Sequence, residues 1–198
     1  MKKLFVLVVV AFMATVVNAQ QMFVKPMVGG TLSTLTGDTE GTKMRLGLVA
    51  GGEFGYMITE QFGATAGLLV SMQGSNYDDT NYTKDVSSTL TYLNVPLLAN
   101  YYVFPGFAVK AGVQFGYLLS AKYKGSENEL GTWVDYDRST TDGLKKLDIS
   151  IPIGLSYEFS NFVIDARYNL GVYNINDLGN ATVKNGVIML TVGYKIPL

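Results

Sequence analysis

Apolar and polar residues alternate along most of this chain, and the alternation is clearest over residues 107–120. One set of alternate positions is entirely apolar and consists of Phe107, Val109, Ala111, Val113, Phe115, Tyr117 and Leu119. The intervening positions are mostly small or polar. Because successive side chains of a β-strand point to opposite faces, the pattern predicts a strand with one apolar face. Such a strand is long for a globular protein and long enough to cross a bilayer at a tilt.

The pattern recurs in eight segments whose connections alternate in length. The predicted strands are 22–32, 44–58, 61–73, 89–103, 107–120, 145–159, 162–174 and 186–198. Connections near 59–60, 104–106 and 160–161 are tight, whereas those at 33–43, 74–88, 121–144 and 175–185 are longer and polar. Short turns alternating with long loops are typical of an outer-membrane barrel, with the turns in the periplasm. We therefore predict an all-β fold, an eight-stranded antiparallel transmembrane β-barrel, whose even strand number leaves no open edge.

The beginning of the chain predicts export. Residues 1–19 combine Lys2 and Lys3 with an apolar stretch and a small-residue cleavage site ending at Ala19, which is the pattern of a secretory signal peptide. Residues 20–198 then form one barrel domain. The expected location is the outer membrane of a Gram-negative bacterium. The chain has no Cys, so no disulfide can staple it, and its net charge of −1 gives no indication of nucleic-acid binding.

The two faces of the predicted strands differ in a way that bears on location. Apolar residues occupy one face, and the other face is rich in small residues, namely Gly47, Gly51, Gly55, Gly63, Gly67, Gly112, Gly116 and Gly154. Small residues suit a crowded interior, because an eight-stranded barrel has room only for its own side chains. A water-exposed surface would carry longer polar residues. This favours a membrane barrel over the remote alternative, a soluble lipid-binding barrel.

The residue inventory argues against catalysis. The chain contains no His and no Cys, which excludes Ser-His-Asp triads, thiolate chemistry and His or Cys metal ligands. Close acidic pairs occur at residues 78–79 and 135–137, both in predicted loops and without calcium-binding spacing. We expect a protein that is not an enzyme and has no cofactor and no metal site.

Nine charged residues fall at inward positions of the predicted strands. They are Lys25, Arg45, Glu53, Lys110, Asp148, Glu158, Asp165, Arg167 and Lys195. We expect a paired structural network, because charges removed from water must be paired and hydrogen-bonded. A small-solute channel is the alternative. The segment 121–144 holds three further candidates, Tyr123, Trp133 and Tyr136, as surface-loop contacts or, alternatively, as an ordered extension of the adjoining strands.

Four segments carry a family resemblance. They are Tyr-Leu-Asn-Val-Pro-Leu-Leu at 92–98, residues 110–119, Asp-Ala-Arg-Tyr-Asn-Leu-Gly at 165–171, and Gly-Tyr-Lys at 193–195. On these segments the chain resembles the PorT-type outer-membrane β-barrel family over essentially its whole mature length. The resemblance implies an outer-membrane location and an eight-stranded barrel. The founding member's tie to protein secretion does not transfer, because a shared barrel does not imply a shared role.

The expected role is therefore structural or interaction-based at the cell envelope: an accessory to secretion or assembly, or a surface-loop binder. Expected partners are outer-membrane lipid, the barrel-assembly machinery during biogenesis, and an unknown protein or surface ligand, but no nucleic acid. One local irregularity is also expected. Pro96 and Pro152 fall inside predicted strands, and because proline lacks an N–H group we expect local bulges there.

Overall fold

A computed structural model describes residues 22–39, 41–129 and 132–198, so the predicted signal segment lies outside the described residues. The strands are β1 (Met22–Gly37), β2 (Thr42–Lys43), β3 (Arg45–Met57), β4 (Phe62–Tyr77), β5 (Thr83–Phe104), β6 (Phe107–Glu129), β7 (Thr132–Ser139), β8 (Leu147–Phe159), β9 (Phe162–Gly171), β10 (Val183–Tyr194) and β11 (Ile196–Pro197). No helix in these ranges is long and apolar enough to cross a membrane.

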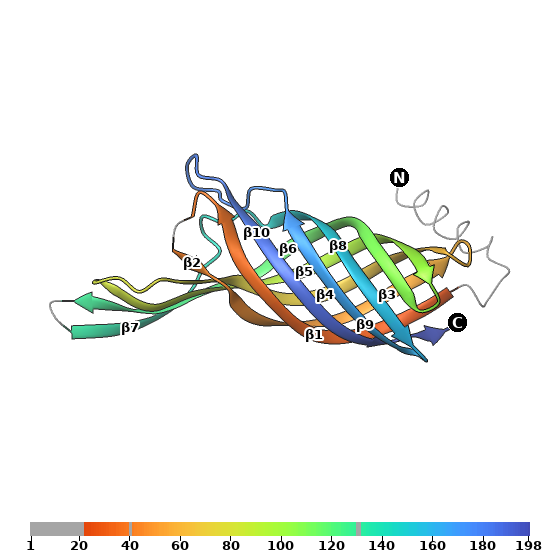
Figure 1. Ribbon diagram of the computed structural model, residues 1–198. Coiled ribbons are helices and arrows are strands. Elements are labelled where there is room, and N and C mark those ends of the chain that lie inside the picture. Colours follow the sequence, from red (N-terminus) through yellow and green to blue (C-terminus); the bar gives the residue numbers. More distant parts are fainter. Residues whose placement is uncertain (1–21, 40, 130–131) are drawn as a thin grey trace, which may run out of the picture.

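Within the described residues, eight long strands form a closed antiparallel ring in the order β1, β3, β4, β5, β6, β8, β9 and β10. The ring closes where β10 pairs with β1, from Met27 opposite Gly193 to Gly37 opposite Val183. Figure 1 shows these strands tilted around one axis. The predicted eight-stranded antiparallel barrel is confirmed. The predicted last strand is divided into β10 and β11, with Lys195 between them.

The apolar face of each strand points outward. Along β8, Ile151, Ile153 and Leu155 are 41 %, 54 % and 49 % exposed, whereas the intervening Pro152 and Gly154 are buried. The inward positions of the other strands carry mainly polar residues with little exposure. A soluble lipid-binding barrel would have the opposite arrangement, with its apolar face inside, so this orientation overturns that alternative.

Aromatic side chains surround the end of the barrel where the short turns lie, which we call the short-turn end. They are Phe54, Tyr56, Phe62, Tyr101, Phe107, Tyr157, Phe159, Phe162 and Tyr194, all at least partly exposed. Phe162 and Tyr194 pack edge to face with ring centroids 5.1 Å apart, and Phe104 stacks on Phe107 at 4.9 Å. Amphipathic rings in such a belt favour the interface between membrane and water.

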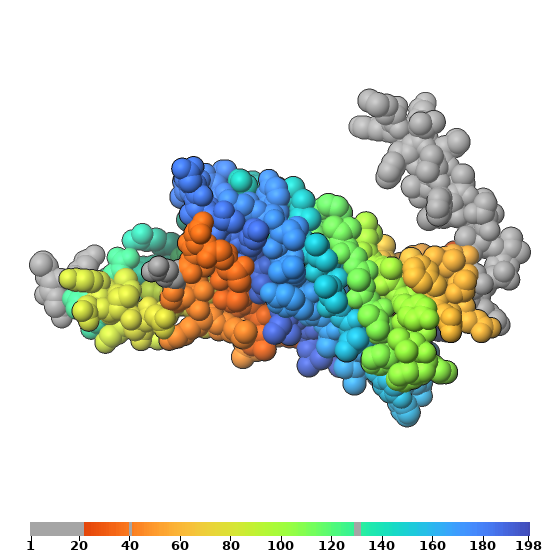
Figure 2. Space-filling view, turned by 45° about the horizontal axis from the view of Figure 1, so that its top comes forward, coloured from red at the N-terminus to blue at the C-terminus, as the bar shows by residue number. Residues whose placement is uncertain are grey.

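At the opposite end of the barrel the strands run beyond their predicted boundaries, and residues 121–144 follow the ordered-extension alternative rather than the loop. The segment 121–144 is not an irregular loop, because β6 continues to Glu129 and β7 pairs with it from Lys122 opposite Ser139 to Glu129 opposite Thr132. The segment 74–88 is also mostly strand, since β4 ends at Tyr77 and β5 begins at Thr83. These hairpins project from one end of the barrel in Figure 1 and form a narrow projection in Figure 2. We call residues 83–88, 121–129 and 132–139 the arm.

Neither internal proline produces the expected bulge. The β4–β5 pairing keeps the same register from Ala66 opposite Leu97 to Leu69 opposite Asn94, on either side of Pro96. Pro152 stays in register opposite Asn169. Register shifts in β5 and β6 occur instead between Lys84 and Ser87, between Thr91 and Tyr92, and between Tyr102 and Phe104. A missing N–H group therefore interrupts the ladder locally, and no residue has to be inserted.

Candidate functional site in the barrel lumen

Five buried charged side chains meet inside the barrel. They are Lys25 of β1, Glu53 of β3, Lys110 of β6, and Asp165 and Arg167 of β9, none more than 5 % exposed. Lys25 Nζ lies 2.7 Å from Glu53 Oε2, and Lys110 Nζ lies 2.5 Å from Asp165 Oδ2. Arg167 donates from Nε to Asp165 Oδ1 and from Nη2 to Glu53 Oε1, at 2.8 Å each. This ion cluster joins four strands across the lumen.

Glycines on neighbouring strands make room for these long side chains. A Cβ atom added to Gly67 would lie 2.9 Å from Glu53 Cγ, and one added to Gly193 would lie 2.9 Å from Lys25 Cγ. A Cβ at Gly154 would lie 2.7 Å from the Cβ of Arg167. Gly67 and Gly154 are the direct cross-strand partners of Glu53 and Arg167. The small inward residues seen in the sequence therefore accommodate the ion cluster.

A second ion pair lies nearer to the short-turn end. Lys195 Nζ contacts both carboxylate oxygens of Glu158, at 2.9 and 3.0 Å, and the two side chains are 21 % and 22 % exposed. The ring of Phe23 lies beneath the same ammonium group, 4.7 Å from Nζ to the ring centroid. No hydrogen bond or ion pair among the described residues joins this pair to Asp165 or Arg167. The inward charges are therefore divided into two groups.

The rest of the lumen holds mostly uncharged polar side chains beside a buried apolar cluster of Met27, Val49, Leu69 and Met189. Gln114 Nε2 donates to Asn94 Oδ1 at 3.3 Å, and Asn94 Nδ2 donates to Ser71 Oγ at 2.8 Å, which links β6, β5 and β4. Asp148 is only 2 % exposed and accepts a hydrogen bond from Asn185 Nδ2 at 3.2 Å. Its Oδ1 atom has no hydrogen-bond partner among the described residues.

Above this polar layer, an apolar cluster closes the lumen at the end where the arm projects. Its buried members are Leu35, Leu90, Tyr92, Leu118, Ala121 and Ile175. Ile175 comes from the connection between β9 and β10 and is fully buried. Its backbone is held in place by hydrogen bonds from Ile175 N–H to Val183 O and from Lys145 N–H to Ile175 O, both 2.8 Å long.

Arg45 lies apart from the other predicted lumen charges. It begins β3 at the mouth near the apolar cluster, is only half-buried, and donates from Nη1 to the carbonyl oxygen of its neighbour Leu46 at 3.1 Å. The ion pairs found among the described residues include neither Arg45 nor Asp148. The structure therefore brings seven of the nine predicted lumen residues into ion pairs and leaves these two outside them.

The three aromatic candidates of the arm have different surroundings. Tyr123 is half-buried and packs against the apolar cluster, so it faces the barrel mouth. Trp133 is 39 % exposed, and Lys84 Nζ lies 4.4 Å from the centroid of its ring. Tyr136 lies against Gly125 on the neighbouring strand, with Arg138 Cζ 5.3 Å from its ring centroid. Only the last two are therefore placed on the projecting surface.

The ion pair on the arm is open to solvent. Lys124 Nζ lies 2.8 Å from Asp137 Oδ2, and the side chains are 58 % and 59 % exposed. The hydrogen bond from Lys124 lowers the pKa of the Asp137 carboxyl below its ordinary value. Ser126 donates to Asp135 Oδ1 at 2.6 Å. Within the described ranges, no group of three or more acidic side chains could hold a metal ion.

Sequence reasoning found the charged lumen residues because alternation marks which positions face inward. It did not find the amide and hydroxyl chain through Gln114, Asn94 and Ser71, although all three lie at inward positions. The signal available in the sequence was the same alternation, applied to uncharged polar residues. It also did not find the apolar cluster. Ile175 lies outside the strands, and the conformation of the β9–β10 connection, which alternation does not predict, places it at the barrel mouth.

Comparison with known proteins supports the architecture. Residues 18–177 match a family described as "Outer membrane protein beta-barrel domain". The crystal structure of Ail, the attachment invasion locus protein of Yersinia pestis, in complex with the heparin analogue sucrose octasulfate, is 18 % identical. That match covers 89 % of this chain and 99 % of Ail, with a TM-score of 0.51. The structure of Yersinia pestis Ail in a phospholipid bilayer nanodisc is 16 % identical, covers 88 % and 99 % of the two chains, and has a TM-score of 0.50. No curated protein matches the chain.

Proposed function

We propose, from the premise that this chain belongs to the family of outer membrane protein beta-barrel domains, that it acts at the cell envelope through interaction rather than catalysis or solute transport. In this proposal the barrel anchors the protein in the outer membrane of a Gram-negative bacterium after removal of residues 1–19. The short-turn end faces the periplasm and the arm faces outward, which follows the usual orientation of such barrels. The partners proposed for the barrel itself are outer-membrane lipid and the barrel-assembly machinery.

The observation that carries the proposal is the arm. Its backbone is ordered by pairing among β5, β6 and β7, yet every described side chain of β7 except Tyr136 is exposed. Tyr117 is the last residue of β6 that pairs with β8. Asn128, which pairs with Trp133 of β7, lies eleven residues further along β6. At about 3.4 Å per residue, this is about 37 Å of strand beyond the closed ring. A rigid projection that carries an aromatic side chain is suited to contacting a protein or another surface ligand.

The lumen supports an anchoring role more than a channel. Paired charges occupy one half, hydrogen-bonded amides occupy the middle, and an apolar cluster closes the other end. An eight-stranded barrel is just wide enough for its own side chains to fill. The expected result in planar bilayers is little or no steady current. A reproducible open channel whose selectivity changes on Asp165→Ala would favour the alternative, a small-solute channel.

The test separates an interaction role from a passive barrel. The gene is deleted and the outer-membrane and secreted proteins are profiled. The deletion strain is then complemented with the full chain or with a trimmed chain. In the trimmed chain, residues 124–137 are replaced by Asn-Gly, which forms a two-residue turn between Tyr123 and Arg138. We expect the trimmed barrel to assemble without restoring the lost phenotype. Full restoration by the trimmed chain would contradict an interaction through the arm. A tag in the β6–β7 connection should be labelled on intact cells.

We further propose that, within this broad family, the chain is akin to the PorT-type barrels. The residues that support it, 92–98 and 165–171, are both in barrel strands and include Asn94, Asp165 and Arg167, which make buried contacts in the lumen. In this proposal, what the chain shares with PorT-type barrels is the set of side chains that pack inside the lumen. Participation in secretion would appear in the deletion experiment as a loss of specific secreted proteins.

A further inference from the structure

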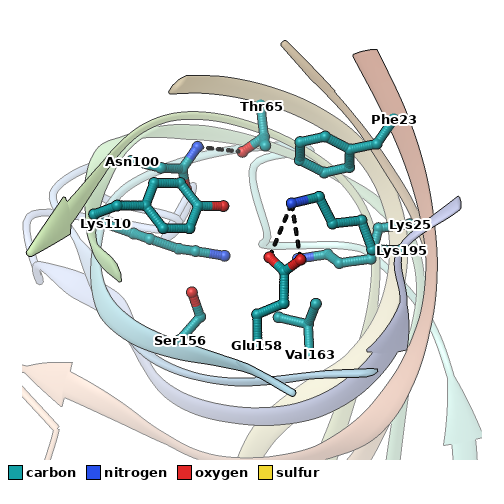
Figure 3. A pocket seen from close by; sticks show the side chains of 10 residues that line it. Phe23, Lys25, Thr65, Asn100, Lys110, Ser156, Glu158, Val163 and Lys195 are labelled. Atoms are coloured by element: carbon teal, nitrogen blue, oxygen red, sulfur yellow. Dashed lines mark hydrogen bonds and ion pairs between the residues drawn. The ribbon is translucent and has the colours of Figure 1, made fainter. Parts of the chain in front are cut away.

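A small cavity lies inside the lumen at the short-turn end. Its volume is about 10 Å³, and its lining residues are Phe23, Lys25, Thr65, Asn100, Tyr102, Lys110, Ser156, Glu158, Val163 and Lys195. In Figure 3 the ends of Lys110, Ser156, Glu158 and Lys195 point into the space between them. A space of this size is at the lower limit for one water molecule, so it admits at most a single small particle, and a halide ion enters only if the flexible lysine side chains that line it shift slightly.

The charges around the cavity do not balance. The ion cluster contains three bases, Lys25, Lys110 and Arg167, against two acids, which gives a net charge of +1. Lys195 and Glu158 neutralise each other and leave that surplus unchanged. Lys25 and Lys110, which carry two of the three positive charges, both line the cavity. An uncompensated buried charge is costly, so the surplus favours a negative particle here.

Hydrogen-bond donors remain available at the same place. An ammonium group carries three N–H donors, and Lys110 contacts one carboxylate oxygen, Asp165 Oδ2. Tyr102 and Ser156, which each carry a hydroxyl group, also line the cavity. Asn100 is 3 % exposed, and its Oδ1 has no hydrogen-bond partner among the described residues. Asn100 Nδ2 contacts Thr65 Oγ1. If the Asn100 side-chain amide is rotated by half a turn, its two end atoms exchange places. Thr65 then donates to Asn100 Oδ1, and the Nδ2 group becomes an N–H donor for the cavity.

Two carboxylates oppose an anion: Glu158, which lines the cavity, and Asp165, whose Oδ2 contacts Lys110 and lies 3.8 Å from Lys25 Nζ. The charge of Asp165 is already counted in the net charge of the ion cluster. The Glu158 carboxylate is the one that faces the cavity. Both of its oxygens are held by Lys195 Nζ, which offsets the charge locally. The same two side chains are about one-fifth exposed, whereas those of the ion cluster are 6 % exposed or less. The cavity therefore adjoins the part of the lumen that solvent reaches from the short-turn end, so a small ion can enter without unfolding the barrel.

We propose that this cavity is a binding site for one halide ion of the chloride class, held by Lys25 and Lys110 together with the neutral donors of Tyr102, Ser156 and Asn100. The single-particle size excludes sulfate, phosphate and carboxylate ligands. The ion brings the charge of the lumen half that contains the ion cluster to zero. It is a structural ligand of the barrel, and its binding is independent of the interaction role proposed for the arm.

The test compares urea unfolding of the refolded full chain in detergent with sodium chloride, sodium bromide or sodium gluconate at equal ionic strength. A ligand that binds only the folded state at ten times its Kd lowers the unfolding constant about tenfold. We expect chloride and bromide to stabilise the barrel relative to gluconate. Ser156→Val, which fills the cavity, should remove the difference, whereas Thr191→Val, a change of a buried inward hydroxyl outside the cavity, should keep it.

Crystals soaked in bromide give the second readout. An anomalous peak is expected in the cavity that Lys25, Lys110 and Ser156 line in the unaltered protein, and not in Ser156→Val. Three results would overturn the proposal: equal stability in all three salts, a halide effect that persists in Ser156→Val, or an ordered water with no anomalous signal in the cavity. None of these results bears on the arm, so the two proposals fail separately.

Discussion

The ion cluster in the lumen and the Lys124–Asp137 ion pair of the arm use the same chemistry in different surroundings. Lys25 lies 2.7 Å from Glu53, and Lys124 lies 2.8 Å from Asp137, so distance does not distinguish the two pairs. Exposure does, because the lumen side chains are 3 % and 0 % exposed and those of the arm 58 % and 59 %. Water can replace a lost partner on the arm, whereas the ion cluster is buried and meets only the small cavity that Lys25 and Lys110 line.

Because of this difference, the ion cluster tolerates few substitutions, whereas the arm tolerates many. Removing one member of the ion cluster takes an ion pair or hydrogen bond from buried partners, which constrains the residues at all five positions. The arm is held mainly by backbone pairing between β5, β6 and β7, which is compatible with many side chains. The arm can therefore change its surface without loss of the barrel, which is what an interaction role requires.

The largest effect is expected for Arg167→Ala. Arg167 donates to both acids of the cluster, so its loss removes hydrogen bonds to two buried carboxylates. We expect the free energy of unfolding, from urea titration in detergent, to fall by about 3–5 kcal/mol. Planar-bilayer recordings should show no large conductance, because Lys25, Lys110 and the amide layer remain. Arg167→Lys, which keeps the charge but not the planar fork, should lose less. Unchanged stability in Arg167→Ala would contradict the structural role.

The second prediction concerns the lipid-facing wall. Ile153 lies at the middle of β8 and is 54 % exposed, so Ile153→Lys should destabilise the barrel in bilayers by about 2–4 kcal/mol. Ile164 is equally exposed but lies near the aromatic belt, next to Tyr157 across the strands. Ile164→Lys should therefore cost about 1 kcal/mol or less, as expected near an interface. Equal costs for the two, measured by folding into lipid vesicles, would place the membrane elsewhere on the barrel.

The barrel could be predicted from the sequence because alternation reports directly which residues share a face. The faces of β8 and β9, and the inward positions of Asp165 and Arg167, follow from that period alone. The partners of these charges could not be predicted, because Glu53 meets Arg167 from a strand more than a hundred residues away, and barrel closure sets that contact. Alternation also gives no information on how far a side chain reaches along the lumen.

The arm shows a different limit of the sequence. Residues 121–144 carry polar or charged side chains at most positions, so they lack the unbroken apolar face by which a membrane strand is recognised. Their strand structure arises from pairing with β5 and β7, which is a tertiary effect. The prolines also show a tertiary effect. Local propensity predicts a bulge at Pro96, but the strand pairing on each side of Pro96 keeps β4 and β5 in register.

A pair of intermediate exposure should have an intermediate effect. Glu158 and Lys195 are about one-fifth exposed, so solvent compensates part of the loss when one of them is changed. Glu158→Gln keeps the shape of the side chain and should lower the unfolding free energy by about 1 kcal/mol. The measurement belongs in chloride-free buffer, so that anion binding near Lys195 does not contribute. If Glu158→Gln lowered the unfolding free energy as much as Arg167→Ala, then solvent exposure would not determine the strength of these ion pairs.

The smallest effect is expected on the arm and is best measured as a titration. The hydrogen bond from Lys124 holds the pKa of Asp137 below its ordinary value, with a smaller contribution from the charge of Lys122. Because the folded-state pKa is lower than the unfolded one, the pair stabilises the arm above the unfolded-state pKa. That contribution is lost as the pH falls through the folded-state pKa.

Carbon-detected NMR of the Asp137 carboxyl should therefore give a midpoint below the ordinary value of 3.8 in the unaltered chain. Lys124→Met should raise the midpoint clearly, whereas Lys122→Met, the matched control, should raise it less. High salt should raise the midpoint in the unaltered chain, because exposed charges are screened. Equal shifts in the two variants would mean that the field of the whole arm, rather than the single Lys124–Asp137 hydrogen bond, sets this pKa. The arm would then be more rigidly organised than its exposure indicates.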